Sequence, residues 1–190
     1  MNALETERLT LRPITLEDAP LVLAVMNDPD FVRYVSDRGL RTPADAARYI
    51  TEKMLPGFEQ NGFGMCAVRL KESGMPIGTC GIFKRNRGDD AEIGFAFLPN
   101  FRGRGFALEA AAAVMNYARD VLKLTRIIAA TKPINAESIK LLEKLGMRFE
   151  RMIFDDACKA EMKLFASAYV RQLPDYGVTR VAAATEKGES

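Results

Sequence analysis

Three apolar segments of strand length follow one another between residues 63 and 98, with short turns between them. The segments are FGMCAVRL, PIGTCGIF and AEIGFAFL, and the turn signals KESGM and KRNRGDD separate them. Segments of this kind are typical of antiparallel strands joined by consecutive hairpins. The next run predicts an amphipathic helix from Phe106 to about Leu122, because its apolar residues share one face. These residues are Leu108, Ala111, Ala112, Met115, Ala118 and Leu122.

The turn between the last strand and this helix is rich in glycine and arginine. It reads FRGRGFA, with Arg102 and Arg104 alternating with Gly103 and Gly105. A glycine turn at a helix start presents unpaired N–H groups and the positive end of the helix dipole, which favours an anion such as diphosphate. The turn lacks the G-K-[ST] of a P-loop and the three-glycine spacing of a dinucleotide fingerprint. A solvated basic turn is the alternative.

The remaining segments give a mixed order of strands and helices. A helix with Thr42 as its cap is expected through TPADAARYITEKMLPGF, ending near Pro56 and Gly57. A short helix, AESIKLLEKLG, should end at Gly146. An earlier helix is expected in TLEDAPLVLAVMND, and strands in RLTLRPI, RIIAAT, RFERMIF and EMKLFASAYV.

The length of 190 residues suits one domain. We expect that domain over residues 1–175 and a loose tail over residues 176–190, since the last ten residues, VAAATEKGES, have no periodicity. No apolar run approaches the roughly 20 residues that a membrane span needs. The start, MNALETERLTLRP, lacks the basic-then-apolar order of a secretion signal. These features predict a soluble, cytoplasmic protein without a membrane partner.

Two totals exclude whole classes of function. The chain has no histidine, which excludes Ser-His-Asp hydrolysis, Cys-His nucleophiles and H-E-x-x-H zinc chemistry within it. Its net charge of +2 argues against a nucleic-acid partner, since such binders carry a large basic excess. The cysteines Cys66, Cys80 and Cys158 form no C-x-x-C pair, so we expect reduced, mostly buried thiols and no metal site.

Glu92 is the candidate catalytic base. In AEIGFAFL, strand alternation places Ile93, Phe95 and Phe97 on one face and Glu92, Gly94 and Ala96 on the other. The two small residues leave room for a substrate beside the carboxylate, which could take a proton from an attacking amine directly or through water. The alternative is a solvated glutamate or a charge pair with the nearby KRNR segment.

The turn RGRGFA has the form Arg/Gln-x-x-Gly-x-Gly/Ala and resembles the signature of the GCN5-related N-acetyltransferases. The blocks ETERLTLRPITLEDA, AEIGFAFLPNFRGRGFALEAA and NAESIKLLEKLGM resemble, in order and wording, the RimJ/RimL subgroup of ribosomal-protein N-terminal acetyltransferases. The resemblance covers roughly residues 5 to 170. It implies an α/β fold with a twisted, mostly antiparallel sheet and helices on both faces. The sheet would split between the AEIGFAFL and RIIAAT strands to admit acetyl-coenzyme A.

The resemblance also implies roles for individual residues. The turn would grip the pyrophosphate of acetyl-coenzyme A, and the pantetheine arm would pair with the splayed strand end. An unpaired N–H near Phe97 or Leu98 would stabilise the oxyanion of the tetrahedral intermediate. The cofactor-binding set of the turn is Arg102, Gly103, Arg104, Gly105, Phe106 and Ala107.

Asn135 and Ser138 form a second set at the start of the AESIKLLEKLG helix. An N-cap and a first-turn residue explain them structurally. In the family that the chain resembles, the asparagine contacts the pantetheine arm and the serine lies near the sulfur, where it could protonate the leaving thiolate. Many relatives place a tyrosine general acid where this chain has Leu142, so the acid is open between Ser138 and a water.

The resemblance implies direct transfer of acetyl to a primary amine, on a protein N-terminus or a small molecule. The early region would line the acceptor pocket, including Phe31, Tyr34, Tyr49, Met54 and Phe58, although most of these residues also suit a core. A non-catalytic coenzyme A or nucleotide sensor on the same fold is the alternative. The acceptor and acyl chain stay open, and so does the choice between monomer and homodimer.

Overall fold

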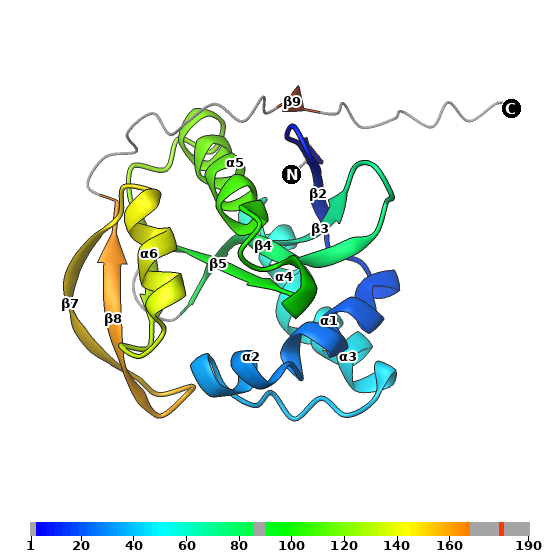
Figure 1. Cartoon of the computed structure of the whole chain (residues 1–190), viewed down its shortest axis with the longest axis horizontal. Coiled ribbons are helices and arrows are strands. Elements are labelled where there is room, and N and C mark those ends of the chain that lie inside the picture. Colours follow the sequence, from blue (N-terminus) through cyan, green and yellow to red (C-terminus); the bar gives the residue numbers. More distant parts are fainter. Residues whose placement is uncertain (1–2, 86–89, 168–178, 181–190) are drawn as a thin grey trace, which may run out of the picture.

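The computed structural model describes residues 3–85, 90–167 and 179–180. Within these residues the strands form one sheet in the order β7-β8-β6-β5-β4-β3-β2-β1-β9 (Figure 1). Neighbouring strands are antiparallel, except for the parallel pair of β5 and β6. The strands are β1 (Leu4–Glu5), β2 (Leu9–Pro13), β3 (Met65–Leu70), β4 (Pro76–Lys84), β5 (Ala91–Phe97), β6 (Ile127–Thr131), β7 (Arg148–Asp155), β8 (Ala160–Ala166) and β9 (Thr179–Arg180).

Helices cover both faces of the sheet. Ile93 and Phe97 of β5 belong to the core under α5 and α6, whereas Ala96 packs with Leu21 and Val25 of α1. Because successive strand residues point to opposite faces, these helices lie on opposite sides. The predicted α/β fold is therefore confirmed. The helical segments are η1 (Leu16–Asp18), α1 (Ala19–Met26), α2 (Pro29–Tyr34), α3 (Pro43–Tyr49), η2 (Ile50–Met54), α4 (Leu55–Asn61), η3 (Pro99–Phe101), α5 (Phe106–Asp120) and α6 (Ala136–Lys144).

The predicted hairpins are also present. The register of β4 and β5 runs from Gly78 opposite Phe97 to Lys84 opposite Ala91, and β3 pairs with the other edge of β4. Some sequence predictions fall outside the described residues: the hairpin tip at 86–89, the end of the EMKLFASAYV strand at 168–170, and the expected tail except for β9. Among the described helices, none is long and apolar enough to cross a membrane.

The helix expected to end near Pro56 and Gly57 continues further. A π-helical segment, η2, follows α3, and α4 then runs on to Asn61 before Gly62 ends it with a φ of 73°. Pro56 lies in the first turn of α4, where a missing N–H costs no helical hydrogen bond. The helical segment thus continues through Pro56 and Gly57 to Asn61, and the predicted helix end was wrong.

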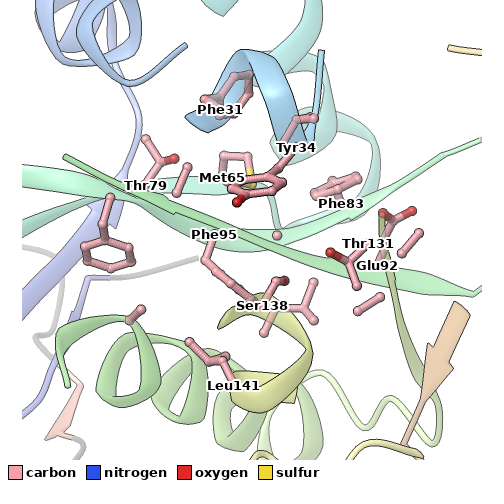
Figure 2. A pocket seen from close by; sticks show the side chains of 18 of the residues that line it. Phe31, Tyr34, Met65, Thr79, Phe83, Glu92, Phe95, Thr131, Ser138 and Leu141 are labelled. Atoms are coloured by element: carbon pink, nitrogen blue, oxygen red, sulfur yellow. The ribbon is translucent and has the colours of Figure 1, made fainter. Parts of the chain in front are cut away.

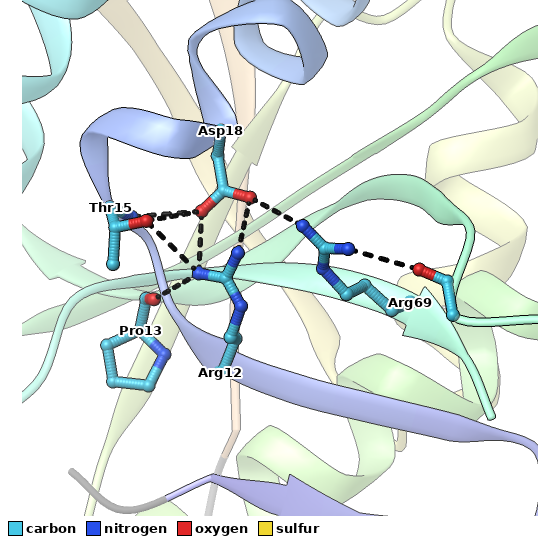
Figure 3. A network of polar contacts seen from close by, with 6 residues as sticks. Arg12, Pro13, Thr15, Asp18 and Arg69 are labelled. Atoms are coloured by element: carbon cyan, nitrogen blue, oxygen red, sulfur yellow. Dashed lines mark hydrogen bonds and ion pairs between the residues drawn. The ribbon is translucent and has the colours of Figure 1, made fainter.

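The start of α1 is fixed by the buried carboxylate of Asp18 (Figure 3). Both guanidinium Nη atoms of Arg12 donate to it at 2.8 Å, and Arg69 Nη2 donates at 3.3 Å. The backbone N–H of Thr15 donates at 2.9 Å. A buried carboxylate is stable only when it is paired and hydrogen-bonded. The network therefore ties β2 and β3 to α1.

Candidate active site

A cavity of about 1140 Å³ opens where β5 and β6 separate. Within the described residues the two strands pair only at Ala91 with Ile127 and at Glu92 with Ile128, so they part beyond Glu92. Figure 2 shows Phe31 and Tyr34 on one side of β5, and Ser138 and Leu141 on the other. The predicted split of the sheet is therefore present between the expected strands.

The cavity brings most of the predicted site residues together. The lining includes Glu92, Phe97, Arg102, Gly103, Gly105, Ala107, Asn135 and Ser138. Three residues of the prediction, all within the described ranges, lie outside the lining: Leu98, Arg104 and Phe106. Phe106, the first residue of α5, is instead buried in the core, and the guanidinium groups of Arg8 and Arg104 lie over its ring.

Glu92 is 3% exposed and faces this cavity. Its Oε2 lies 3.5 Å from Nε of Arg85, whose Nη1 also contacts Asp155 at 3.1 Å. The charge pair with the KRNR segment is thus real, and it coexists with a place in the cavity wall. Part of the room that Gly94 leaves is filled by the ring of Phe83, since an added Cβ would lie 2.7 Å from that ring.

The turn before α5 has the backbone that its glycines predict. Gly103 and Gly105 have φ values of 71° and 83°, a left-handed region that disfavours residues with a Cβ. Gly105 is the N-cap residue of α5 and carries no capping side chain. The first N–H groups of the helix therefore lack a side-chain acceptor at that position, as an anion site requires.

Arg102 is already engaged by the protein. Its Nε donates to the carbonyl oxygen of Phe97 at 2.8 Å, Nη1 pairs with Asp30 at 2.7 Å, and Nη2 pairs with Asp28. Asp28 also caps α2 by accepting from the N–H of Asp30 and of Phe31. Arg102 therefore fastens α2 to the end of β5, and its charge is largely balanced before any ligand arrives.

Sequence reasoning missed a buried network behind the turn. Glu109, in the first turn of α5, is 1% exposed. Its Oε1 accepts from Thr6 Oγ1 at 2.5 Å and from the N–H of Arg8 at 2.9 Å, while Oε2 accepts from Arg8 Nε at 2.7 Å. Arg8 Nη1 donates to the carbonyl oxygen of Arg104 at 3.2 Å. The signals in the sequence were weak: an acid in the first turn of a helix, and a threonine and an arginine in the distant ETERL segment.

The hydrogen bonding of β5 decides between the two candidate oxyanion donors, the N–H groups of Phe97 and Leu98. The N–H of Leu98 donates to the carbonyl oxygen of Ile77 at 3.0 Å, on the β4 side. In an antiparallel pair, successive N–H groups alternate between the two sides of a strand. Leu98 is therefore excluded as the donor, and the N–H of Phe97 points to the edge that β6 leaves open.

Asn135 caps α6, as expected, because its Oδ1 accepts from the N–H of Ser138 at 3.1 Å. Ser138 lies on the α6 side of β5 in Figure 2. Leu142 is 1% exposed and belongs to the core as well as to the cavity wall, so that position offers no hydroxyl group. Thr131, which the sequence did not mark, brings a hydroxyl from β6 to the same cavity.

Most of the early aromatic residues line the cavity rather than only the core. Phe31, Tyr34 and Tyr49 do so together with Met54, whereas Phe58 packs against Gly64. The short helix α2, which carries Phe31 and Tyr34, was not predicted as a separate element. Its signal was the pair Asp28 and Pro29, a cap followed by proline at the first helical position.

Comparison with known proteins agrees with this geometry. The model of the acetyltransferase (GNAT) domain matches residues 8–148. The chain belongs to this family. It is 35% identical over 159 residues to an uncharacterized N-acetyltransferase, p20, of Bacillus licheniformis, covering 82% of this chain and 87% of that protein. It is 30% identical over 145 residues to YnaD of Bacillus subtilis, an uncharacterized N-acetyltransferase, covering 76% and 82%.

Solved structures of GNAT proteins share the fold. An acetyltransferase from Agrobacterium tumefaciens superposes with a TM-score of 0.74 at 26% identity, covering 87% of this chain and 94% of that one. RimJ of Mycobacterium smegmatis, solved in complex with CoA-disulfide, gives a TM-score of 0.71 at 20% identity, covering 86% and 84%. The latter likeness concerns the fold alone.

Proposed function

We propose that this GNAT acetyltransferase moves acetyl from acetyl-coenzyme A directly to a primary amine, as a RimJ/RimL-type enzyme or a relative acting on small molecules. The observation that carries the proposal is the separation of β5 and β6 beside Glu92, in a cavity that also reaches the glycine turn before α5. An extended arm can lie along the open edge of β5 while its phosphate groups rest on the helix start. The sequence blocks quoted above support the RimJ/RimL assignment.

Binding of the donor would use backbone groups more than charge. The N–H groups at the start of α5, after Gly103 and Gly105, would hold the pyrophosphate, with Arg104 adding positive charge nearby. Arg102 would act mainly by holding the end of β5, given its ion pairs with Asp28 and Asp30. Asn135 would contact the pantetheine arm.

The chemistry would take place between Glu92 and Ser138. Glu92 would remove a proton from the attacking amine, directly or through water, while the N–H of Phe97 stabilises the oxyanion. Ser138 would protonate the leaving thiolate. These roles share one cavity, and the base and acid candidates come from β5 and α6 respectively.

Direct transfer fits the environment of the cysteines. Burial raises the pKa of Cys66 to about 12 and also raises the pKa of Cys80, so both thiols stay protonated and weakly nucleophilic. Cys158 differs because it lines the cavity, with its Sγ 3.9 Å from the carbonyl oxygen of Asp155. It is therefore the cysteine to test for a covalent intermediate.

A screen for free-thiol release from acetyl-coenzyme A across a panel of amines tests the proposal. Release that depends on the amine, with acetylated amine as product, is the expected result. If acetyl-coenzyme A binds but no amine accelerates release, the alternative of a non-catalytic coenzyme A sensor replaces the proposal.

A further inference from the structure

The acidic side chains that face the cavity already have cationic partners within the protein. A polyamine or aminoglycoside site needs several carboxylates that are available to a polycation. The pairs are Asp30 with Arg102, Glu92 and Asp155 with Arg85, and Glu137 with Lys140. Arg85 is shared by Glu92 and Asp155, but the described lining contains seven Lys and Arg residues against four Asp and Glu residues, and this excess of positive charge disfavours a polycation.

Arg38 is the opposite case. It lines the cavity from the segment between α2 and α3, and its Nε is buried without a hydrogen-bond partner. Among the residues that the structure describes, no carboxylate pairs with its guanidinium group. The adjacent acid, Asp37, is occupied: it pairs with Arg41 at 2.5 Å and accepts from the N–H of Gly39 at 2.8 Å. This local turn presents Arg38 to the cavity without neutralising it.

The cavity that Arg38 lines has further apolar and cationic side chains in its wall. Phe31, Tyr34 and Phe83 project toward the cavity in Figure 2. Lys53 and Lys84 add positive charge to the lining. A buried Nε–H without an acceptor is unfavourable, and a carboxylate can bind a guanidinium group with two parallel hydrogen bonds.

We propose that the acceptor is a small primary amine with an apolar body and a carboxylate, such as a free apolar amino acid, and that Arg38 binds the carboxylate. This inference rests on the proposed acetyl transfer, and it names the substrate class of that site. An N-terminal peptide with neutral side chains lacks a carboxylate near its amine, and a polyamine is repelled by Arg38. Both are therefore poorer acceptors.

The test compares phenylalanine, leucine and methionine with their amides, which keep the amine and the body but lose the carboxylate. Wild type, Arg38→Gln and Arg48→Gln are assayed for kcat/KM, with spermidine and a neutral peptide as further acceptors. Arg48 is a matched control because it is exposed on the adjacent helix α3 and pairs with Asp45 outside the cavity. Circular dichroism and thermal unfolding check that each variant is folded.

We expect Arg38→Gln to lower kcat/KM for the amino acids about tenfold to a hundredfold, the range for one charge-assisted bidentate contact. The amides should change little, and Arg48→Gln should affect neither group. The ammonium group of an amino acid amide has a lower pKa than that of the amino acid. This difference cancels when the ratio of variant to wild-type kcat/KM is compared between the two groups of substrates. Equal losses on acids and amides, or faster acetylation of spermidine or the peptide, would overturn the assignment while leaving acetyl transfer intact.

A binding measurement separates this inference from the proposed function. Calorimetry with coenzyme A present compares N-acetylphenylalanine with N-acetylphenylalaninamide, and it needs no turnover. Tighter binding of the carboxylate that disappears in Arg38→Gln supports the anion site even if no amine is acetylated. Equal binding of the two compounds in wild type refutes it.

Discussion

Glu109→Gln tests whether the buried network behind the turn holds the cofactor end of the site. The substitution keeps the size of the side chain but places an amide NH₂ against the guanidinium group of Arg8, or against Thr6 and the N–H of Arg8. Two charge-assisted contacts to Glu109 Oε2 are at stake, from Arg8 Nε at 2.7 Å and from Nη2 at 2.6 Å. The opposing donors cannot both be satisfied.

The magnitude follows from these contacts. A hydrogen bond to a charged group contributes about 1.5–3 kcal/mol, but the Arg8 side chain is 43% exposed, so solvent screening reduces its share. We therefore expect a loss of about 2–3 kcal/mol in the free energy of unfolding. For a domain of this size that corresponds to a decrease of about 4–12 °C in Tm.

Thermal unfolding by calorimetry or circular dichroism measures this loss, with Glu143→Gln, an exposed change on α6, as the control. The double variant Arg8→Met, Glu109→Met should be more stable than Arg8→Met alone, because the single variant leaves a buried carboxylate without its cation. At a temperature where Glu109→Gln is still folded, its affinity for acetyl-coenzyme A should be lower than that of wild type, because Arg8 also binds the carbonyl oxygen of Arg104 in the turn. An unchanged Tm in Glu109→Gln would refute this reasoning.

Three further predictions concern the cavity itself. Gly105→Val should weaken acetyl-coenzyme A binding in calorimetry while the protein remains folded, because its φ of 83° disfavours a branched side chain and a Cβ would lie 3.3 Å from Arg8 Nη2; unchanged affinity would remove the turn from the site. Glu92→Gln should lower turnover on the order of a hundredfold at neutral pH with nearly unchanged donor affinity, and partly recover at higher pH as the amine loses its proton unaided. Steady-state rates across pH decide this, and wild-type turnover at neutral pH would contradict the role of Glu92 as base. Cys158→Ser should keep wild-type kcat, whereas trapping of an acetylated Cys158 by mass spectrometry would disprove direct transfer.

The sequence predicted the elements whose signals are local. The hairpins from β3 to β5 follow from short turns between apolar segments, and the N-cap of α6 follows from Asn135. The glycine turn was predictable because positive φ values leave a mark in the sequence. The separation of β5 from β6 came from the family resemblance, since backbone pairing between distant strands leaves no local pattern.

What the sequence could not give depends on contacts between distant segments. Arg102 looked like a free cation because Asp28 and Asp30, which neutralise it, lie more than seventy residues earlier in the chain. The sequence did not mark Arg38, because only the fold shows that the neighbouring Asp37 pairs with Arg41. Which arginines are already paired within the protein therefore depends on the fold and not on the local sequence.

The contacts of Arg102 connect the two halves of the site. Its Nε holds the carbonyl oxygen of Phe97, the residue whose N–H faces the open edge, while its Nη atoms hold the N-terminal turn of α2. That helix carries Phe31 and Tyr34 into the cavity and leads to Arg38. In the proposed function, a shift of α2 on acceptor binding would act through Arg102 on the strand end where the donor would lie. Because one side chain makes both contacts, the proposed positions of the acceptor and of the oxyanion would both depend on Arg102.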